Sequence, residues 1–218
     1  MYRFDESKHK RDELGRFAKK DFAELKSLAT QEIENRPQFE EKRISDIIIQ
    51  EIKHNRVKKV GAKYNLNSRE INAIHKYVNS FDDSWYKLIN ETLRKGLPLS
   101  KEDEQICKHL DSALDKIAKY KGDLLRVIDL QGEDLKNFLD LHQVGKTVTY
   151  DAYTSTSSSE EPQERGNVYI SIPESKCGAD LRDFNPAQSE ILYKRNAKFK
   201  VVDLYKYGDV YKVSLEEV

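Results

Sequence analysis

Three short segments in the second half of the sequence carry side chains that could do chemistry. Residues 124–128 (LLRVI) place an arginine, Arg126, inside an apolar stretch. Residues 153–157 (YTSTS) are rich in hydroxyls, and residues 188–193 (QSEILY) combine an amide with a carboxylate. Together they supply a cation, a hydroxyl cluster and an acid, which are the groups needed to hold a dinucleotide and stabilise a sugar cation.

Residues 188–193, which include the carboxylate of Glu190, have the residue pattern of a strand whose first residues lie at a binding or catalytic site. Alternation along a strand puts Gln188 and Glu190 on one face and Ser189 on the other. A carboxylate there can accept hydrogen bonds from sugar hydroxyls and stabilise positive charge that grows at an anomeric carbon. The amide of Gln188 could hold a second substrate. An ordinary solvated strand edge would explain the same residues.

The other polar positions also have two explanations each. Arg126 must be paired or face a cleft, because an unpaired buried charge is very costly. Its forked donors suit a pyrophosphate, although a structural ion pair is the alternative. Residues 153–157 could bind a sugar or form a surface turn. Asn90 and Arg94 lie four residues apart on one predicted helix face, where Arg94 could reach a phosphate or simply meet solvent.

The elements around these segments change from helical to strand-like along the chain. In the first half, apolar residues recur at helix spacing, and Asn67 and Glu70 are spaced as in a capping box. After Gly122, short β-branched and aromatic runs alternate with turn residues. This order predicts an α+β fold with segregated layers. We expect a flexible polar tail over residues 1–20, a helical lobe over 21–120 and a β-rich core over 121–218.

The composition narrows the functional classes. The 218 residues include 38 basic and 38 acidic side chains, so no net field draws the chain to nucleic acid or an anionic membrane. The two cysteines and five histidines follow no ligand spacing, so we assign no metal. No apolar stretch approaches the ~18 residues of a membrane span, and no secretory signal is visible. We expect a cytoplasmic protein in the cell that makes it.

In combination, the three segments resemble the signature of the bacterial exotoxin-type mono-ADP-ribosyltransferases, which is Arg, Ser-Thr-Ser and Gln/Glu-x-Glu. The resemblance covers roughly residues 65–213 and includes the helical motif at 86–94 and the strand-like run at 167–173. It implies an N-terminal helical lobe packed on a two-sheet, mainly antiparallel β-sandwich, with NAD in the cleft between them. One transferase domain would span about residues 65–215.

The resemblance also implies a role for individual residues. Arg126 would hold the phosphates of NAD, helped by Arg94 and Asn90. Ser155 would brace Glu190, which would bind the ribose 2′-hydroxyl and stabilise the oxocarbenium ion as nicotinamide leaves. Three further cofactor-binding residues are implied: Thr156, Ser157 and Arg165.

The first position of the last motif bears on the acceptor. In the family, Glu at this position goes with arginine acceptors, because a second carboxylate can pair with a guanidinium. Gln goes with asparagine or glutamine of small GTPases, or with guanine in DNA. Gln188 therefore implies a protein amide, and the neutral net charge argues against DNA. The GTPase modifiers carry an aromatic residue five positions before the acid; here Asn185 stands there and Phe184 precedes it, which leaves the target open. Phe184 and Gln188 are the residues expected to recognise the acceptor.

Other functions stay open on the sequence alone. Water could be the acceptor, which would make the chain an NAD glycohydrolase. Residues 58–74 resemble the middle of a helix-turn-helix, the mark of a nucleic-acid-binding module. Residues 10–17 (KRDELGRF) resemble segments of bacteriophage head-associated proteins, so a phage-encoded enzyme carried into a bacterium, or a phage structural protein, is a further alternative. For the leading hypothesis we expect a protein acceptor such as a GTPase, a monomer and no membrane partner.

Overall fold

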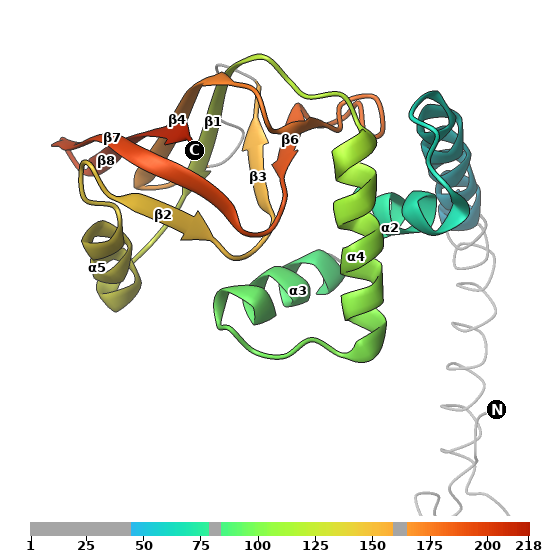
Figure 1. The fold of residues 1–218 in the computed structure, drawn as a ribbon, viewed down its shortest axis with the longest axis horizontal. Coiled ribbons are helices and arrows are strands. Elements are labelled where there is room, and N and C mark those ends of the chain that lie inside the picture. Colours follow the sequence, from blue (N-terminus) through green and yellow to red (C-terminus); the bar gives the residue numbers. More distant parts are fainter. Residues whose placement is uncertain (1–44, 79–83, 159–164) are drawn as a thin grey trace, which may run out of the picture. The chain divides into compact units, whose positions relative to one another are not determined.

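The computed structural model describes residues 45–78, 84–158 and 165–218, and the predicted tail over residues 1–20 lies outside them (Figure 1). The chain divides into two compact units, Met1–Ile52 and Lys53–Val218. The elements and sites described below, from Lys53 on, belong to the second unit. Within the described residues, no helix is long and apolar enough to cross a membrane.

Three of the helices that precede the strands are α2 (Ser68–Val78), α3 (Ser84–Arg94) and α4 (Lys101–Lys116). The predicted capping box at the start of α2 is confirmed. The Asn67 side chain accepts a hydrogen bond from the Glu70 backbone N–H at 3.1 Å, and the Glu70 carboxylate accepts one from the Asn67 N–H at 2.8 Å. These reciprocal bonds satisfy two donors that the first turn would otherwise leave free.

The helices share one apolar core with part of the strand region. Fully buried side chains of this core include Ile74 of α2, Ile89 of α3 and Leu110 of α4. Leu192 and Tyr153, from the second half of the chain, belong to the same cluster. Burial of such side chains is the main stabilising term, so the helical layer and the neighbouring strands are one folding unit.

The helix pair at residues 58–74 is present, but it is built into this core. A helix over residues 45–63 is followed by a turn and then α2. The α2 helix buries Glu70, Ala73, Ile74 and Tyr77. This burial accounts for the helix pair as a packed part of the core. The presence of the pair therefore gives no separate support to a DNA-binding module.

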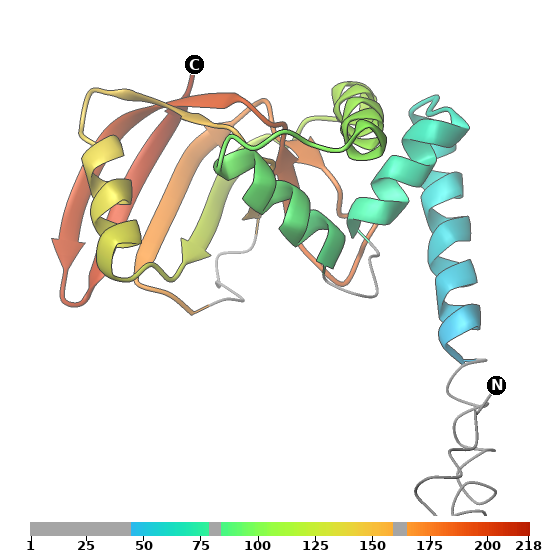
Figure 2. The ribbon, with the colours of Figure 1, turned by 90° about the horizontal axis from the view of Figure 1, so that it is seen from below.

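Eight strands and one further helix make up the second half of the chain. They are β1 (Gly122–Ile128), α5 (Gly132–Leu141), β2 (Thr147–Tyr150), β3 (Thr154–Ser157), β4 (Val168–Ser175), β5 (Ala179–Asp180), β6 (Glu190–Tyr193), β7 (Ala197–Tyr207) and β8 (Val210–Glu217). The predicted α+β class, with helices before strands, is confirmed. Figure 2 shows α5 at the end of the sheet away from α4.

The strands form a sheet in the order β2-β7-β8-β4-β1-β3-β6-β5. All neighbours are antiparallel except β4 and β8. The junction between β1 and β3 is held at a single register position, Leu125 opposite Ser157, whereas β1 and β4 pair along their whole length. The sheet therefore divides at this junction into a five-stranded and a three-stranded part, and the three sequence motifs lie on strands beside it.

Candidate active site

The second and third sequence motifs lie side by side on adjacent strands. Strands β3 and β6 pair antiparallel, with Ser157 directly opposite Glu190 and Thr154 opposite Tyr193. The side chain of Ser155, two residues from Ser157 along β3, forms a hydrogen bond with the Glu190 carboxyl group. The sheet register thus sets a hydroxyl and a carboxylate in contact although they are remote in sequence.

Alternation along β3 separates its hydroxyls into two sets. Thr154 and Thr156 are buried, and the Thr156 hydroxyl donates to the Ile191 carbonyl oxygen at 2.8 Å. Ser155 and Ser157 lie on the other side of the strand and are partly exposed. The expectation that Thr156 binds the cofactor is corrected by this geometry, because its hydroxyl is committed to the backbone of the next strand.

The first motif is joined directly to the second. Arg126 of β1 donates a hydrogen bond from Nη1 to the Ser155 carbonyl oxygen at 2.6 Å. The guanidinium also exerts its positive charge on Glu190. The structure therefore brings together Arg126, Ser155 and Glu190, one residue from each of the three segments.

The Glu190 carboxyl group has a perturbed acidity. Burial raises its pKa above the ordinary value, while the Ser155 hydrogen bond and the positive charge of Arg126 act in the opposite direction. A carboxylate that is both desolvated and faced by a cation is typical of a functional site. The Glu190 side chain is partly exposed, so a ligand can reach it.

A second cation faces the first. Arg94 ends α3, and the pKa of its guanidinium is lowered, first by burial and then by the positive charge of Arg126. Among the residues that the structure describes, neither Arg94 nor Arg126 forms an ion pair with a carboxylate. Two such guanidinium groups near each other, neither held in a direct ion pair among the described residues, suit a pyrophosphate.

The side chain of Asn90, which the resemblance implies to help bind the phosphates of NAD, is bonded to other residues of the protein. It is 5% exposed, and its Oδ1 accepts a hydrogen bond from the Tyr153 backbone N–H at 3.1 Å. Its side chain also forms a hydrogen bond with the hydroxyl of Tyr77. In this geometry Asn90 ties α3 to the residue that leads into β3, so an NAD contact by its amide would compete with these bonds.

Two tyrosines near the site escaped the sequence analysis. Burial raises the pKa of the Tyr77 hydroxyl, which also feels the charges of Glu190 and Arg126. Burial likewise raises the pKa of Tyr150, against the positive charge of Arg126. Both phenols therefore stay protonated beside the site. Their sequence settings, an apolar helix face and the end of a short strand, carried no signal of this position.

The segment before Glu190 is a tight turn with one exposed amide. Gln188 is exposed, and its Oε1 accepts a hydrogen bond from Asn185 Nδ2 at 3.2 Å. Phe184 is 1% exposed and its ring stacks on Tyr64 with centroids 6.1 Å apart. The expectation that Phe184 recognises the acceptor is corrected, because its ring is part of the core and is not offered to a partner.

Arg165 lies at the start of the segment that leads into β4. Its side chain is exposed, and among the residues that the structure describes it does not contact Arg126, Ser155 or Glu190. The chain is anchored just after it, since Asn167 bonds both the N–H and the carbonyl of Leu130, at 2.9 and 2.7 Å. The backbone close to Arg165 is therefore held in place, but the Arg165 side chain does not lie with Arg126, Ser155 and Glu190.

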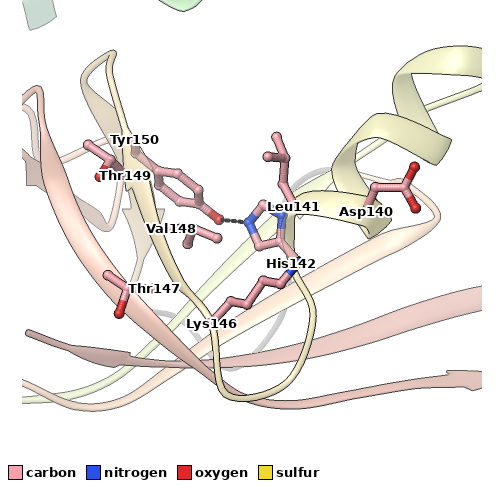
Figure 3. Close-up of a pocket in the computed structure, with 8 residues that line it drawn as sticks. All are labelled: Asp140, Leu141, His142, Lys146, Thr147, Val148, Thr149 and Tyr150. Carbon is pink, nitrogen blue, oxygen red and sulfur yellow. Dashed lines mark hydrogen bonds between the residues drawn. The ribbon is translucent and has the colours of Figure 1, made fainter.

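A pocket of about 250 Å³, lined in part by Tyr150, lies between the end of α5 and β2 (Figure 3). At its wall, His142 Nδ1 lies 2.7 Å from the Phe138 carbonyl and Nε2 lies 2.8 Å from the Tyr150 hydroxyl. A carbonyl can only accept, so Nδ1 carries the proton and Tyr150 donates to Nε2. Burial lowers the pKa of His142, which is consistent with a neutral ring. None of the predicted site residues lines this pocket.

Comparison with known proteins identifies the family of this chain. The model of the family described as ADP-ribosyltransferase exoenzyme matches residues 52–218 of this chain. The chain belongs to the ADP-ribosyltransferase exoenzyme family. NAD is the ADP-ribose donor in this family, and the described residues contain no group of three or more His, Cys, Asp or Glu that could hold a metal ion.

One curated relative of this ADP-ribosyltransferase family member is the NAD(+)–protein-arginine ADP-ribosyltransferase Tre1 of Pseudomonas putida strain GB-1. The two are 30% identical over 155 residues, which make up 70% of this chain and 30% of Tre1. The chain therefore spans less than a third of the length of this relative.

Solved structures of other bacterial enzymes share the fold. The C3 exoenzyme of Clostridium limosum superimposes with a TM-score of 0.57 at 18% identity, over 78% of this chain and 94% of that one. Exoenzyme S of Pseudomonas aeruginosa, solved with human 14-3-3 protein beta and bound to carba-NAD, gives 0.56 at 18% identity, over 78% and 89%. At these identities the likeness shows the ADP-ribosyltransferase fold.

Proposed function

We propose that this chain cleaves NAD at the bond between nicotinamide and ribose and transfers ADP-ribose to a protein side chain. The observation that carries the proposal is the chain of contacts from Arg126 to Ser155 and from Ser155 to Glu190. It joins a phosphate-binding cation to a carboxylate suited to stabilising a sugar cation. The family match over residues 52–218 supports the same reaction.

Each member of the cluster has a distinct task in this proposal. Glu190, ionised, stabilises the positive charge that develops on the ribose as the bond to nicotinamide breaks. Ser155 holds the carboxylate in one orientation, so that little reorganisation is needed during the reaction. Arg126 and Arg94 bind the two phosphates through charge-assisted hydrogen bonds. Ser157, which pairs with Glu190 across the sheet, would contact the same ribose.

We further propose that the acceptor is a neutral side-chain nitrogen, that of asparagine or glutamine. The support is Gln188, an exposed amide two residues before Glu190 where an arginine-modifying enzyme would carry a second acid. An amide can bind an amide through one donor and one acceptor, but it cannot draw a proton from guanidinium. Arginine is the second candidate, because the relative Tre1 is named as a protein-arginine ADP-ribosyltransferase.

The acceptor protein and its location follow the same line. We propose that the acceptor is a protein such as a GTPase in a target cell, because Gln188 stands where the GTPase modifiers that the sequence resembles also carry glutamine. Delivery into that cell, including transport in a phage particle, belongs to this proposal as well.

The test is transfer of labelled NAD into bacterial and animal lysates, followed by mass spectrometry of the modified side chain. We expect label on asparagine or glutamine of a protein band that is absent with Glu190→Gln. Label on arginine would refute the proposed role of Gln188. Release of nicotinamide without labelled protein would leave NAD hydrolysis as the activity.

A further inference from the structure

An ion-pair cluster on α4 holds the two site strands at the end opposite to Glu190. Its centre is Asp111, a partly buried acid of α4 that bonds one group on each strand side. Its Oδ1 accepts from the Tyr153 hydroxyl at 2.8 Å, and its Oδ2 accepts from Arg195 Nε at 2.8 Å. The sequence indicated no role for Asp111 or Arg195.

Tyr153 is the last residue before β3. It is 3% exposed, and its backbone N–H donates to Asn90 of α3 while its hydroxyl donates to Asp111 of α4. The same hydroxyl lies 3.0 Å from the Cys107 carbonyl. Both ends of the residue are therefore fixed to helices, and Ser155 follows two positions later on the strand.

Arg195 lies two residues after β6. Its side chain is 16% exposed, and besides Asp111 it meets both oxygens of Glu104, at 3.2 and 3.4 Å. Hydrogen bonds to Glu104 and Asp111 outweigh the effect of burial and raise the pKa of this guanidinium. A charge-assisted bond from a planar fork defines orientation as well as distance.

The register links these anchors to the site. Thr154 pairs with Tyr193 at the anchored end of the ladder, and Ser157 pairs with Glu190 at the other end. A strand advances about 3.3 Å per residue. Ser155 lies two residues from Tyr153, and Glu190 lies five residues from Arg195. A displacement of either anchored residue would therefore also shift Ser155 or Glu190. Tyr153 also bonds Asn90 of α3 through its backbone N–H, so it fixes the position of Ser155 and Glu190 relative to α3, which carries Arg94.

We propose that Asp111 is a positioning residue for the reaction: by binding Tyr153 and Arg195 together, it sets where Ser155 and Glu190 lie relative to Arg94. The inference rests on the proposed function, because it concerns the alignment of groups that would hold NAD. Asparagine at position 111 can accept from Tyr153, but its Nδ2 then faces the Arg195 Nε–H, donor against donor. Asp111→Asn is thus a near-isosteric change that releases one strand.

The molecule offers a matched control one helical turn along. Asp115 of α4 bonds Lys194, the neighbour of Arg195, with both oxygens at 2.8 Å. This pair joins the same helix to the same strand end, but it does not contact Tyr153. Its side chains are 62% and 37% exposed, so the pair adds little stability.

The experiment compares the purified full chain with Asp111→Asn, Tyr153→Phe and Asp115→Asn. Nicotinamide release from NAD gives kcat and KM, and thermal unfolding is followed by circular dichroism. We expect kcat/KM to fall roughly 10- to 100-fold in Asp111→Asn, with KM raised, because small misplacements of reacting groups are costly. The kcat/KM of Tyr153→Phe should also fall. The double variant Asp111→Asn/Tyr153→Phe should lose less kcat/KM than the product of the two single losses, because both changes break the same contact. The kcat/KM of Asp115→Asn should stay within about twofold of wild type.

A structural role alone would lower the melting temperature of Asp111→Asn without changing KM at a temperature where it is folded, and that result would overturn the proposal. Equal losses in Asp111→Asn and Asp115→Asn would also overturn it. If Asp111→Asn does not fold, Tyr153→Phe decides by the same criterion. An active wild-type enzyme with unchanged variants refutes only this inference, whereas a wild-type chain that releases no nicotinamide refutes the proposed function with it.

Discussion

Arg126 donates a hydrogen bond to the carbonyl oxygen of Ser155 at 2.6 Å and so joins β1 to β3. These two strands pair at only one other position, Leu125 with Ser157. The bond therefore serves as a tie at the point where the sheet divides, and it keeps the guanidinium beside the Ser155–Glu190 pair. One arginine can hold the local backbone and still present its remaining donors to an anion, because a guanidinium carries five N–H groups.

The first prediction concerns Glu190 and stability. Burial raises the pKa of its carboxyl group, so the folded state holds the proton more tightly than the unfolded state. The contribution of this group to stability is fully present below the unfolded pKa and is lost as the pH rises through the folded pKa. We expect Glu190→Gln to melt ~2–4 °C higher than wild type at about pH 7.5.

The same variant supplies its own control at acid pH. Well below the ordinary carboxyl pKa of 4.5, Glu190 is protonated in both states and resembles glutamine. The difference in melting temperature should then disappear. Thermal unfolding by circular dichroism at both pH values checks the prediction, and a lower melting temperature of the variant at neutral pH would count against a desolvated carboxylate.

The second prediction concerns the buried acid Glu70. Burial raises its pKa, but hydrogen bonds from Lys116, Ser112 and the Asn67 N–H outweigh this and the net shift is downward. Its stabilising contribution is present above the unfolded pKa and is lost as the pH falls through the lower folded value. We expect Glu70→Gln to cost about 2–4 kcal/mol at neutral pH, because Lys116 loses its ionic partner at 2.7 Å.

The control for Glu70 is an exposed pair. Glu91 and Lys95 lie 2.5 Å apart on α3 with side chains 57% and 60% exposed. Glu91→Gln should leave the free energy of unfolding nearly unchanged, because water screens an exposed pair. Urea unfolding of both variants gives the comparison, and equal losses would contradict the assigned role of burial.

The third prediction concerns Gly166, which precedes β4. A Cβ at this position would lie 2.3 Å from the Ile128 carbonyl oxygen, a backbone atom that cannot move aside alone. We expect Gly166→Ala to destabilise the fold by about 2–3 kcal/mol. Gly61→Ala is the control, since its Cβ would meet side chains and no backbone atom, Ile71 Cγ1 at 3.1 Å and Leu66 Cδ1 at 3.4 Å, and alanine favours the helix. A free energy of unfolding unchanged by Gly166→Ala would show that this backbone approach is not required.

The fourth prediction concerns the acceptor. Gln188 is exposed and bonded only to the short side chain of Asn185 among the described contacts, so Gln188→Glu should fold normally. The new carboxylate could pair with guanidinium and help remove its proton. We expect transfer to a free arginine analogue such as agmatine to rise at least about tenfold, while nicotinamide release without acceptor stays within about twofold. No gain with agmatine would mean that position 188 does not select the acceptor.

Local and motif-based features of this chain were accessible from the sequence. The capping box of Asn67 and Glu70 depends on residues three apart, and the structure has it. The convergence of Arg126, Ser155 and Glu190 followed from a motif of three spaced parts. Alternation along a strand also predicts that Ser155 and Thr156 lie on opposite sides of β3, as they do.

Long-range contacts were not accessible in this way. Nothing near Asn90 indicates that its amide oxygen bonds Tyr153, 63 residues later. Nothing near Asp111 indicates that it bonds Arg195 across 84 residues. Phe184 stands beside the acceptor position in sequence, yet its ring turns into the core. Such outcomes depend on how the helical layer packs on the strands, and the spacing of residues along the chain does not encode them.

The most direct test of the account is the rate of nicotinamide release from NAD by wild type and by Glu190→Gln. Both proteins should show the same circular dichroism spectrum, because the change is nearly isosteric. The account predicts release by wild type and a loss of at least roughly 100-fold in Glu190→Gln, since the charge that stabilises the ribose cation is gone. Release by the folded variant at the wild-type rate would contradict the central role of this carboxylate.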